Sequence, residues 1–161
     1  MLADEKVHRW IGVSVFLLTL GTYIKTMAPA VSFWDCGEFI ATSYILGVPH
    51  PPGSPLYVLL GRLFSMVPLS DVAVRITFMS ALSSALAVWC VYLSTLARGR
   101  RALGGHSLKP FGDHRDIGLI AGAVVAALSL AFSYTQWFNA TEAEVYGYSI
   151  FFTCFGLWLI L

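Results

Sequence analysis

Charged residues are scarce in this sequence of 161 residues. Asp, Glu, Lys and Arg make up 12% of the chain, whereas a soluble domain carries roughly 25%. Hydrophobic residues reach 57%, and the mean hydropathy is +0.73. These values exclude an ordinary soluble domain. The formal net charge of +1 lacks the basic excess that nucleic-acid binding needs, so no nucleic-acid partner is expected.

Cysteine is also rare. The three cysteines are far apart, and no C-x-x-C or similar metal-binding spacing occurs. Cys90 and Cys154 lie inside apolar runs, and Cys36 stands beside two acids. We interpret all three as packing residues.

The apolar runs lack the alternation of apolar and polar residues that membrane barrel strands show. Several runs approach the roughly 20 residues that cross a bilayer as a helix. The sequence therefore predicts one all-α integral membrane domain over residues 1–161. Because the sequence stops inside an apolar run, we expect this domain to be the N-terminal part of a longer one. The predicted spans cover residues 10–27, 72–97, 117–133 and 147–161, the last of them incomplete.

The apolar segment 54–67 is short and carries Arg62 at its centre. An arginine at mid-bilayer costs a few kcal/mol. Basic residues in short loops favour the cytoplasm, which places the N-terminus and the loop 98–116 on that side. Segment 54–67 then cannot cross as well, so it is predicted to be a surface helix in an outer loop 28–71. Pro51 and Pro52 would form its first turn, and segment 134–146 would also lie outside.

Asp35 and Glu38 are the first candidate site residues. Three positions apart, they share a face on a helix, and no cation adjoins them in the sequence. Repulsion and a setting near lipid would then raise the pKa of Glu38. Such a pair can act as a general base, hold a metal or orient a hydroxyl. Alternatively, the two acids only solvate the start of a helix.

His50 and Arg62 are candidate phosphate ligands. His50 precedes two prolines and Gly53, which hold the backbone and let another group approach closely. A histidine held in this way can bind a phosphate or transfer a proton, or simply occupy a turn. Arg62 can bind a phosphate through its planar fork or extend towards lipid headgroups.

Glu142 and Glu144 form an E-x-E pair in the sequence NATEAEVYG. In an extended segment the two carboxylates point the same way and can supply oxygens to Mg²⁺ or Mn²⁺. In a helix Glu142 would instead share a face with Tyr146. The alternative for all three residues is an ordinary solvated helix end at the membrane interface.

Three stretches together resemble a known family: VSFWDCGEFIATSYILGVPHPPGSPLY, RITFMSALSSALAVW and WFNATEAEVYG. The arrangement is similar to the GT-C class of membrane glycosyltransferases and to protein O-mannosyltransferases. Its nearest resemblance is to the N-terminal part of bacterial glycosyltransferase family 117, formerly a domain of unknown function. The fold implied is a GT-C-like helical bundle in the bacterial inner membrane, with a cytoplasmic N-terminus.

The resemblance implies transfer of a sugar from a polyprenyl phosphate donor to a protein or glycan acceptor on the non-cytoplasmic face. Asp35 would be the catalytic base, and Glu38 would help to position the acceptor. The expected substrate-binding residues are His50, Arg62, Glu142, Glu144 and Tyr146. No cofactor follows with certainty. A divalent cation at Glu142 and Glu144 is left open, because protein O-mannosyltransferases are generally metal-independent.

A second hypothesis is a non-catalytic membrane subunit derived from this family. It predicts partner subunits within a larger complex, and it rests on the short length of the chain for an enzyme of this class. Both hypotheses predict contact with membrane lipid along the apolar segments.

Overall fold

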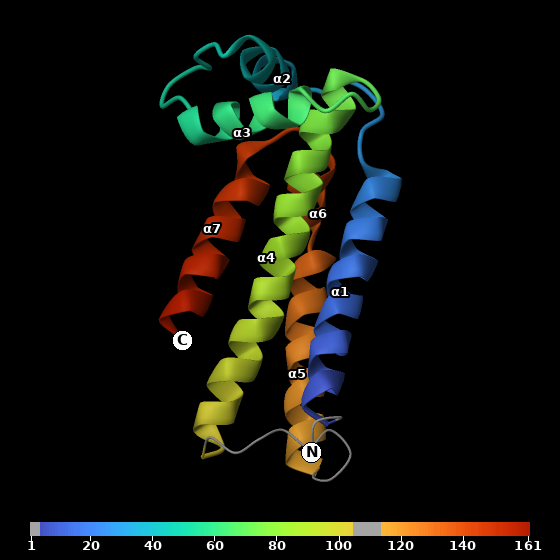
Figure 1. Ribbon diagram of the computed structural model, residues 1–161, viewed down its shortest axis with the longest axis vertical. Coiled ribbons are helices and arrows are strands. Elements are labelled where there is room, and N and C mark those ends of the chain that lie inside the picture. Colours follow the sequence, from blue (N-terminus) through green and yellow to red (C-terminus); the bar gives the residue numbers. More distant parts are fainter. Residues whose placement is uncertain (1–3, 105–113) are drawn as a thin grey trace.

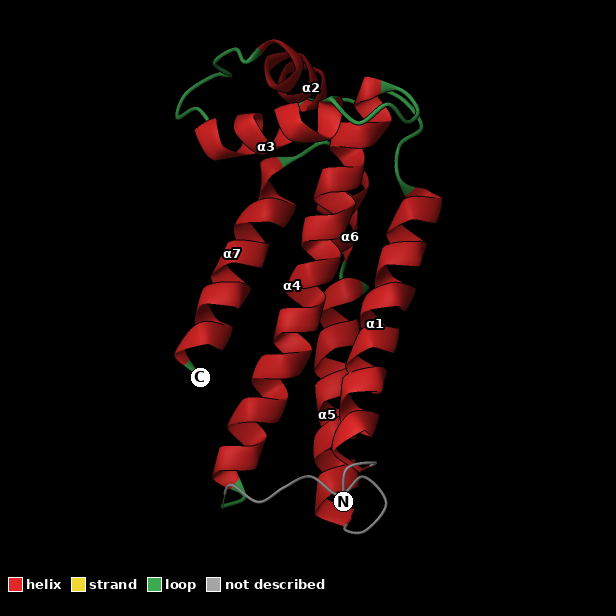
Figure 2. Ribbon diagram, viewed as in Figure 1, coloured by secondary structure: helices red, strands yellow, loops and turns green. Residues whose placement is uncertain are grey.

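The computed structural model describes residues 4–104 and 114–161, and every regular element in these ranges is a helix (Figure 2). Helices α1, α4, α5 and α7 run along the length of the molecule, and the shorter α2 and α3 lie across one end (Figure 1). The bounds are α1 Asp4–Thr26, α2 Cys36–Ile45, α3 Pro55–Ser65, α4 Val72–Ala102, α5 His114–Ala131, α6 Tyr134–Thr141 and α7 Val145–Ile160.

Within residues 4–104 and 114–161, three helical segments are long and apolar enough to cross a membrane: Val7–Thr26, Val72–Ala102 and His114–Ala131. Helix α7 has 16 residues and meets the same criterion only together with α6, from which it is bent by 117°. The prediction of an all-helical fold with helices of membrane-spanning length and hydropathy is therefore confirmed for the described residues.

Helix α4 is the centre of the bundle. Its membrane segment is 67% buried, against 22% for α1 and 28% for α5. Small residues on α4, such as Ala81, Ser84 and Ala85, are fully buried and let neighbouring helices approach closely. Gly147 of α7 lies against Ser84, where an added Cβ would collide with the serine hydroxyl.

Several predicted boundaries were wrong. Helix α4 continues to Ala102 and α5 begins at His114, so the predicted polar loop 98–116 is partly helical. Residues 1–3 and 105–113 of the predicted inner segments lie outside the described residues. Segment 134–141 is a helix rather than a loop. The sequence did not indicate this helix because its buried face contains the polar residues Gln136 and Asn139. The usual helical repeat of apolar residues is therefore absent from this segment.

Helix α3 begins at Pro55, within one residue of its predicted start, but its first turn does not contain Pro51 and Pro52 as predicted. Those two prolines form the preceding turn, closed by a hydrogen bond from the Gly53 N–H to the His50 carbonyl (2.9 Å). At the other end, the Arg75 guanidinium donates to the carbonyls of Ser65, Val67 and Ser70. This arginine satisfies carbonyls that the end of α3 leaves without helical partners.

The two acid-bearing segments meet at the end of the bundle where α2 and α3 lie (Figure 1). The Ala28 N–H donates to the Thr141 carbonyl (2.9 Å), which ties the start of the first segment to the end of α6. The convergence that the charge pattern predicted is thus present in the fold.

Candidate functional site

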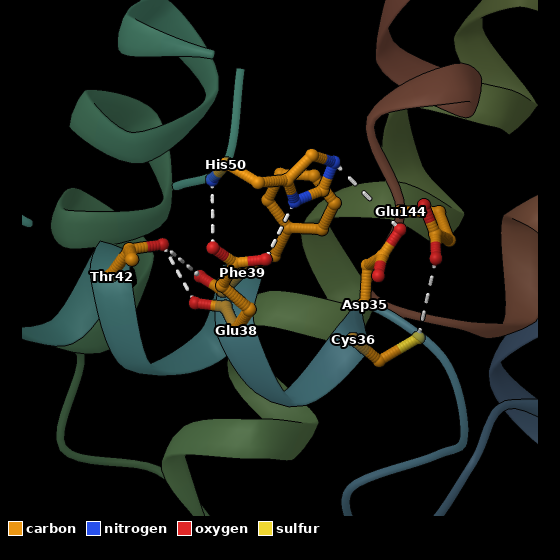
Figure 3. Close-up of polar contacts among 7 residues, drawn as sticks. All are labelled: Asp35, Cys36, Glu38, Phe39, Thr42, His50 and Glu144. Atoms are coloured by element: carbon orange, nitrogen blue, oxygen red, sulfur yellow. Dashed lines mark hydrogen bonds and ion pairs between the residues drawn. The ribbon is translucent and has the colours of Figure 1, made fainter. Parts of the chain in front are cut away.

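Glu38 and His50 form a close pair at the first turn of α2. Glu38 Oε1 accepts a hydrogen bond from the His50 backbone N–H (2.7 Å), and Oε2 lies 2.6 Å from His50 Nδ1. Figure 3 shows the carboxylate held in both contacts. The two bonds fix the turn 46–53 against α2 and fix the orientation of the imidazole.

This pair reverses the electrostatic expectation for Glu38. The hydrogen bond from the His50 side chain is the main reason why the pKa of Glu38 is lowered, and not raised as predicted. The same bond raises the pKa of His50, with further contributions from Asp35 and Glu144. The expectation was wrong because the fold brings a cation to a pair that has none beside it in the sequence.

Asp35 stands at the N-cap of α2, and its side chain forms no capping hydrogen bond. This position also agrees with the alternative of a solvated helix start. Asp35 Oδ2 lies 3.9 Å from His50 Nε2, and the side chain is 57% exposed. The imidazole therefore bridges two carboxylates, with Nδ1 on Glu38 and Nε2 towards Asp35 (Figure 3).

Glu142 and Glu144 lie in the break between α6 and α7. Both have extended backbone angles (φ −127° and −122°), so the extended alternative is the one present. Glu142 therefore does not share a helical face with Tyr146. Both carboxylates reach the thiol of Cys36, whose Sγ lies 3.6 Å from Glu142 Oε2 and 3.6 Å from Glu144 Oε1. Ser32 Oγ also donates to Glu142 Oε1 (2.6 Å).

Glu144 is buried, with 7% of its surface exposed. Desolvation is the main cause that raises its pKa, and the nearby charges of Asp35 and Glu142 add to the rise. Figure 3 shows Asp35 and Glu144 between His50 and Cys36. The five groups, here named the acid–histidine cluster, are Asp35, Glu38, His50, Glu142 and Glu144. Across the described part of the chain, the only salt bridges of this cluster are those with His50.

Two predicted substrate-binding residues lie apart from the cluster. Arg62 Nη1 donates to the Tyr44 carbonyl (2.6 Å), and the guanidinium lies 5.5 Å from the centre of the Tyr44 ring. Arg62 therefore ties α3 to the end of α2. Tyr146 is 58% exposed in the first turn of α7 and, within the described residues, forms no hydrogen bond to the cluster.

A divalent cation fits one part of the cluster. Asp35, Glu38 and His50 each offer a ligand atom, and these atoms lie within 4.8 Å of one another. Carboxylate and imidazole ligands together suit several divalent metals, and a histidine that ligates through one nitrogen commonly has the other held by a carboxylate. In this structure that role would fall to Glu38, whereas Glu142 and Glu144 converge on a thiol.

The sequence interpretation missed Cys36 and Ser32. Cys36 was interpreted as a packing residue, and it is fully buried, but its sulfur also joins two segments more than 100 residues apart. Nothing in the spacing of the motifs indicated this contact. Its proximity to Asp35 was the only available signal.

A groove of about 480 Å³ is lined by residues that flank His50 in the sequence, among them Pro49 and Pro52. Segment 46–55 forms one side of it, and Val58 and Leu59 of α3 form the other. Its lining is mostly apolar, and Val48 within it is 87% exposed.

A family model described as "Protein O-mannosyl-transferase TMEM260 N-terminal domain" matches residues 35–161. The curated "Protein O-mannosyl-transferase tmem260" of Dictyostelium discoideum is 39% identical over 85 residues, which cover 51% of this chain and 10% of that protein. The "Protein O-mannosyl-transferase TMEM260" of Mus musculus is 30% identical over 135 residues, 83% of this chain and 17% of that protein. The matched region thus spans less than a fifth of either relative. No solved structure matches.

Proposed function

This chain belongs to the TMEM260 N-terminal domain family of protein O-mannosyl-transferases, and from this membership we propose that its acid–histidine cluster takes part in mannosyl transfer. The donor is a polyprenyl phosphate mannose, and the acceptor is a hydroxyl group of a protein or glycan. The observation that carries the proposal is the exposed Asp35 carboxylate, which caps no helix N–H, beside an imidazole oriented by Glu38.

Asp35 is the proposed general base. A base must reach the acceptor hydroxyl and have a free lone pair for its proton. The Asp35 side chain is exposed and caps no helix N–H, whereas Glu38 already accepts two hydrogen bonds from His50. Glu38 is therefore the group that positions His50, and Asp35 is the group left to accept a proton.

His50 is the proposed contact for the donor phosphate. The raised pKa of His50 favours the protonated ring, and a cation stabilises the negative charge that develops on a departing phosphate. Half-buried Arg62 and exposed Tyr146 are further proposed contacts for the donor and the acceptor.

The proposed reaction is a direct displacement at the anomeric carbon. The acceptor oxygen forms a bond to that carbon as its proton passes to Asp35. The bond between the anomeric carbon and the phosphate oxygen breaks, and the electron pair leaves with the lipid phosphate. A divalent cation held by Asp35, Glu38 and His50 would be an alternative to the protonated imidazole and would supply Lewis-acid stabilisation of the phosphate charge.

The apolar groove that Pro49 and Pro52 help to line supports a lipid-linked donor. An isoprenoid chain could lie between segment 46–55 and α3 while its phosphate reaches His50. Helix α3 also exposes a stripe of apolar side chains at helical spacing, which suits a helix lying at a membrane surface. These side chains are Leu56, Leu59, Leu63 and Met66.

The proposed orientation follows from charge. Arg98, Arg100 and Arg101 lie at the last turns of α4, at the end of the bundle opposite the cluster (Figure 1). The positive-inside rule then places the N-terminus in the cytoplasm and the cluster on the outer face. We further propose that the full-length protein belongs to the GT-C class and to glycosyltransferase family 117, and that it lies in a bacterial inner membrane. The sequence motifs support these assignments.

The test is a donor comparison with the native full-length protein reconstituted in liposomes. We expect mannose transfer from polyprenyl phosphate mannose and none from GDP-mannose. Transfer from the nucleotide sugar would contradict the proposed donor. Absence of transfer from both donors, in a folded protein that co-purifies with a stoichiometric partner, would favour the non-catalytic subunit.

A further inference from the structure

Cys36 occupies an unusual place for a buried cysteine. Its side chain is fully buried at the first residue of α2, directly after the proposed base Asp35. Its sulfur faces two carboxylates at equal distance, 3.6 Å from each, and Figure 3 shows the thiol directed at Glu144. A packing role alone needs no such alignment.

The thiol is a neutral hydrogen-bond donor in this setting. Burial is the main cause that raises the pKa of Cys36 to about 12, followed by the negative charges of Glu144 and Glu142. The sulfur therefore keeps its proton near neutral pH. A neutral donor can hold a carboxylate without cancelling its charge, which a lysine or arginine would do.

Glu144 depends on this donor for its side-chain position. Its carboxylate receives hydrogen bonds from Cys36 and from the Val145 backbone N–H, and its carbonyl accepts one from Ser80 Oγ of α4 (3.2 Å). Glu142 has a second donor in Ser32. Loss of the thiol would thus leave each carboxylate with one of these donors, the Val145 N–H for Glu144 and Ser32 for Glu142.

We propose that Cys36 is a positioning residue of the transfer site, whose thiol holds the Glu144 carboxylate within the acid–histidine cluster. This inference rests on the proposed function and deepens it. It assigns a role to a residue between the two acids of the first motif.

The test compares three variants of the native full-length protein in the mannose-transfer assay. Cys36→Ala removes the donor, Cys36→Ser keeps a donor, and Cys90→Ala removes a buried thiol of α4 that contacts none of these acids. We expect Cys36→Ala to lower kcat about tenfold, the order of one hydrogen bond to a charged group, with KM for the donor nearly unchanged. Cys36→Ser should recover most of that loss, and Cys90→Ala should leave kcat within about twofold of wild type, since it removes no polar contact.

An equal loss of kcat in Cys36→Ala and Cys90→Ala, or no recovery of kcat in Cys36→Ser, would overturn the proposal.

A measurement without turnover separates this inference from the proposed function. The infrared S–H stretching band of Cys36, assigned by its loss in Cys36→Ala, should shift in Glu144→Gln because the acceptor changes. An unshifted band would contradict the hydrogen bond even in an active enzyme. A shifted band in a wild-type protein that transfers no mannose would contradict the proposed function, and with it the catalytic role of Cys36, but would uphold the contact.

Discussion

At the scale of single residues, the imidazole of His50 determines the charge balance of the site. Its Nδ1 lies 2.6 Å from Glu38 and its Nε2 lies 3.9 Å from Asp35. We predict that an NMR titration finds the pKa of His50 above its usual 6.5 and that Glu38→Gln lowers it. Asp71→Asn, at the N-cap of α4, is the matched control and should leave it unchanged.

The sign of the pH effect on stability follows from the two shifts. The raised pKa of His50 gives stabilisation that is complete below 6.5 and is lost as the pH rises through the raised value. The lowered pKa of Glu38 gives stabilisation that is present above 4.5 and is lost as the pH falls through the lowered value. The ion pair therefore stabilises the position of segment 46–53 against α2 most strongly between pH 4.5 and pH 6.5. A His50 pKa at or below 6.5 in the wild-type protein would contradict the pair.

At the scale of helices, close packing of α7 on α4 positions Glu144. A Cβ at Gly147 would meet Ser84 Oγ, the Ser80 carbonyl at 3.3 Å and the Asn139 carbonyl at 3.6 Å. We predict that Gly147→Ala lowers the free energy of unfolding by about 1–3 kcal/mol, the usual cost of overpacking. The measurement is thermal unfolding in mild detergent.

Gly156 on the same helix supplies the control, because a Cβ there would meet nothing within 4 Å. Gly156→Ala should leave stability unchanged or raise it slightly, since alanine favours helix. Equal effects of the two substitutions would show that the approach of α7 to α4 is not tight at Gly147.

The helices also show how far sequence reasoning reached. Long apolar runs predicted the three membrane segments, because length and hydropathy are local properties of a sequence. Helix α6 was missed because its buried residues include Gln136 and Asn139. Helix α3 starts within one residue of its predicted start, but the wrong prolines were assigned to its first turn. Pro51, Pro52 and Pro55 all suit a first turn, and only the fold shows that Pro55 occupies it.

At the scale of the whole molecule, two distant segments of the chain form one site at one end of the bundle (Figure 1). The distribution of basic residues predicted this meeting before the structure, because topology places alternate loops on the same side of a membrane. The contacts within the site were not predictable in that way. The Cys36 bonds to Glu142 and Glu144 and the Glu38–His50 pair depend on side-chain placement that no local pattern encodes.

The most direct test of the central claim is mannose transfer by Asp35→Asn in the native full-length protein. Asparagine keeps the size of the side chain but cannot accept the proton of the acceptor hydroxyl. We predict a loss of kcat of at least about a hundredfold, as for removal of a general base, with unchanged thermal unfolding. Asp71→Asn, an exposed aspartate at the N-cap of α4 without a side-chain capping bond, should retain wild-type activity. Wild-type transfer by a folded Asp35→Asn protein would contradict the assignment of this cluster as the transfer site.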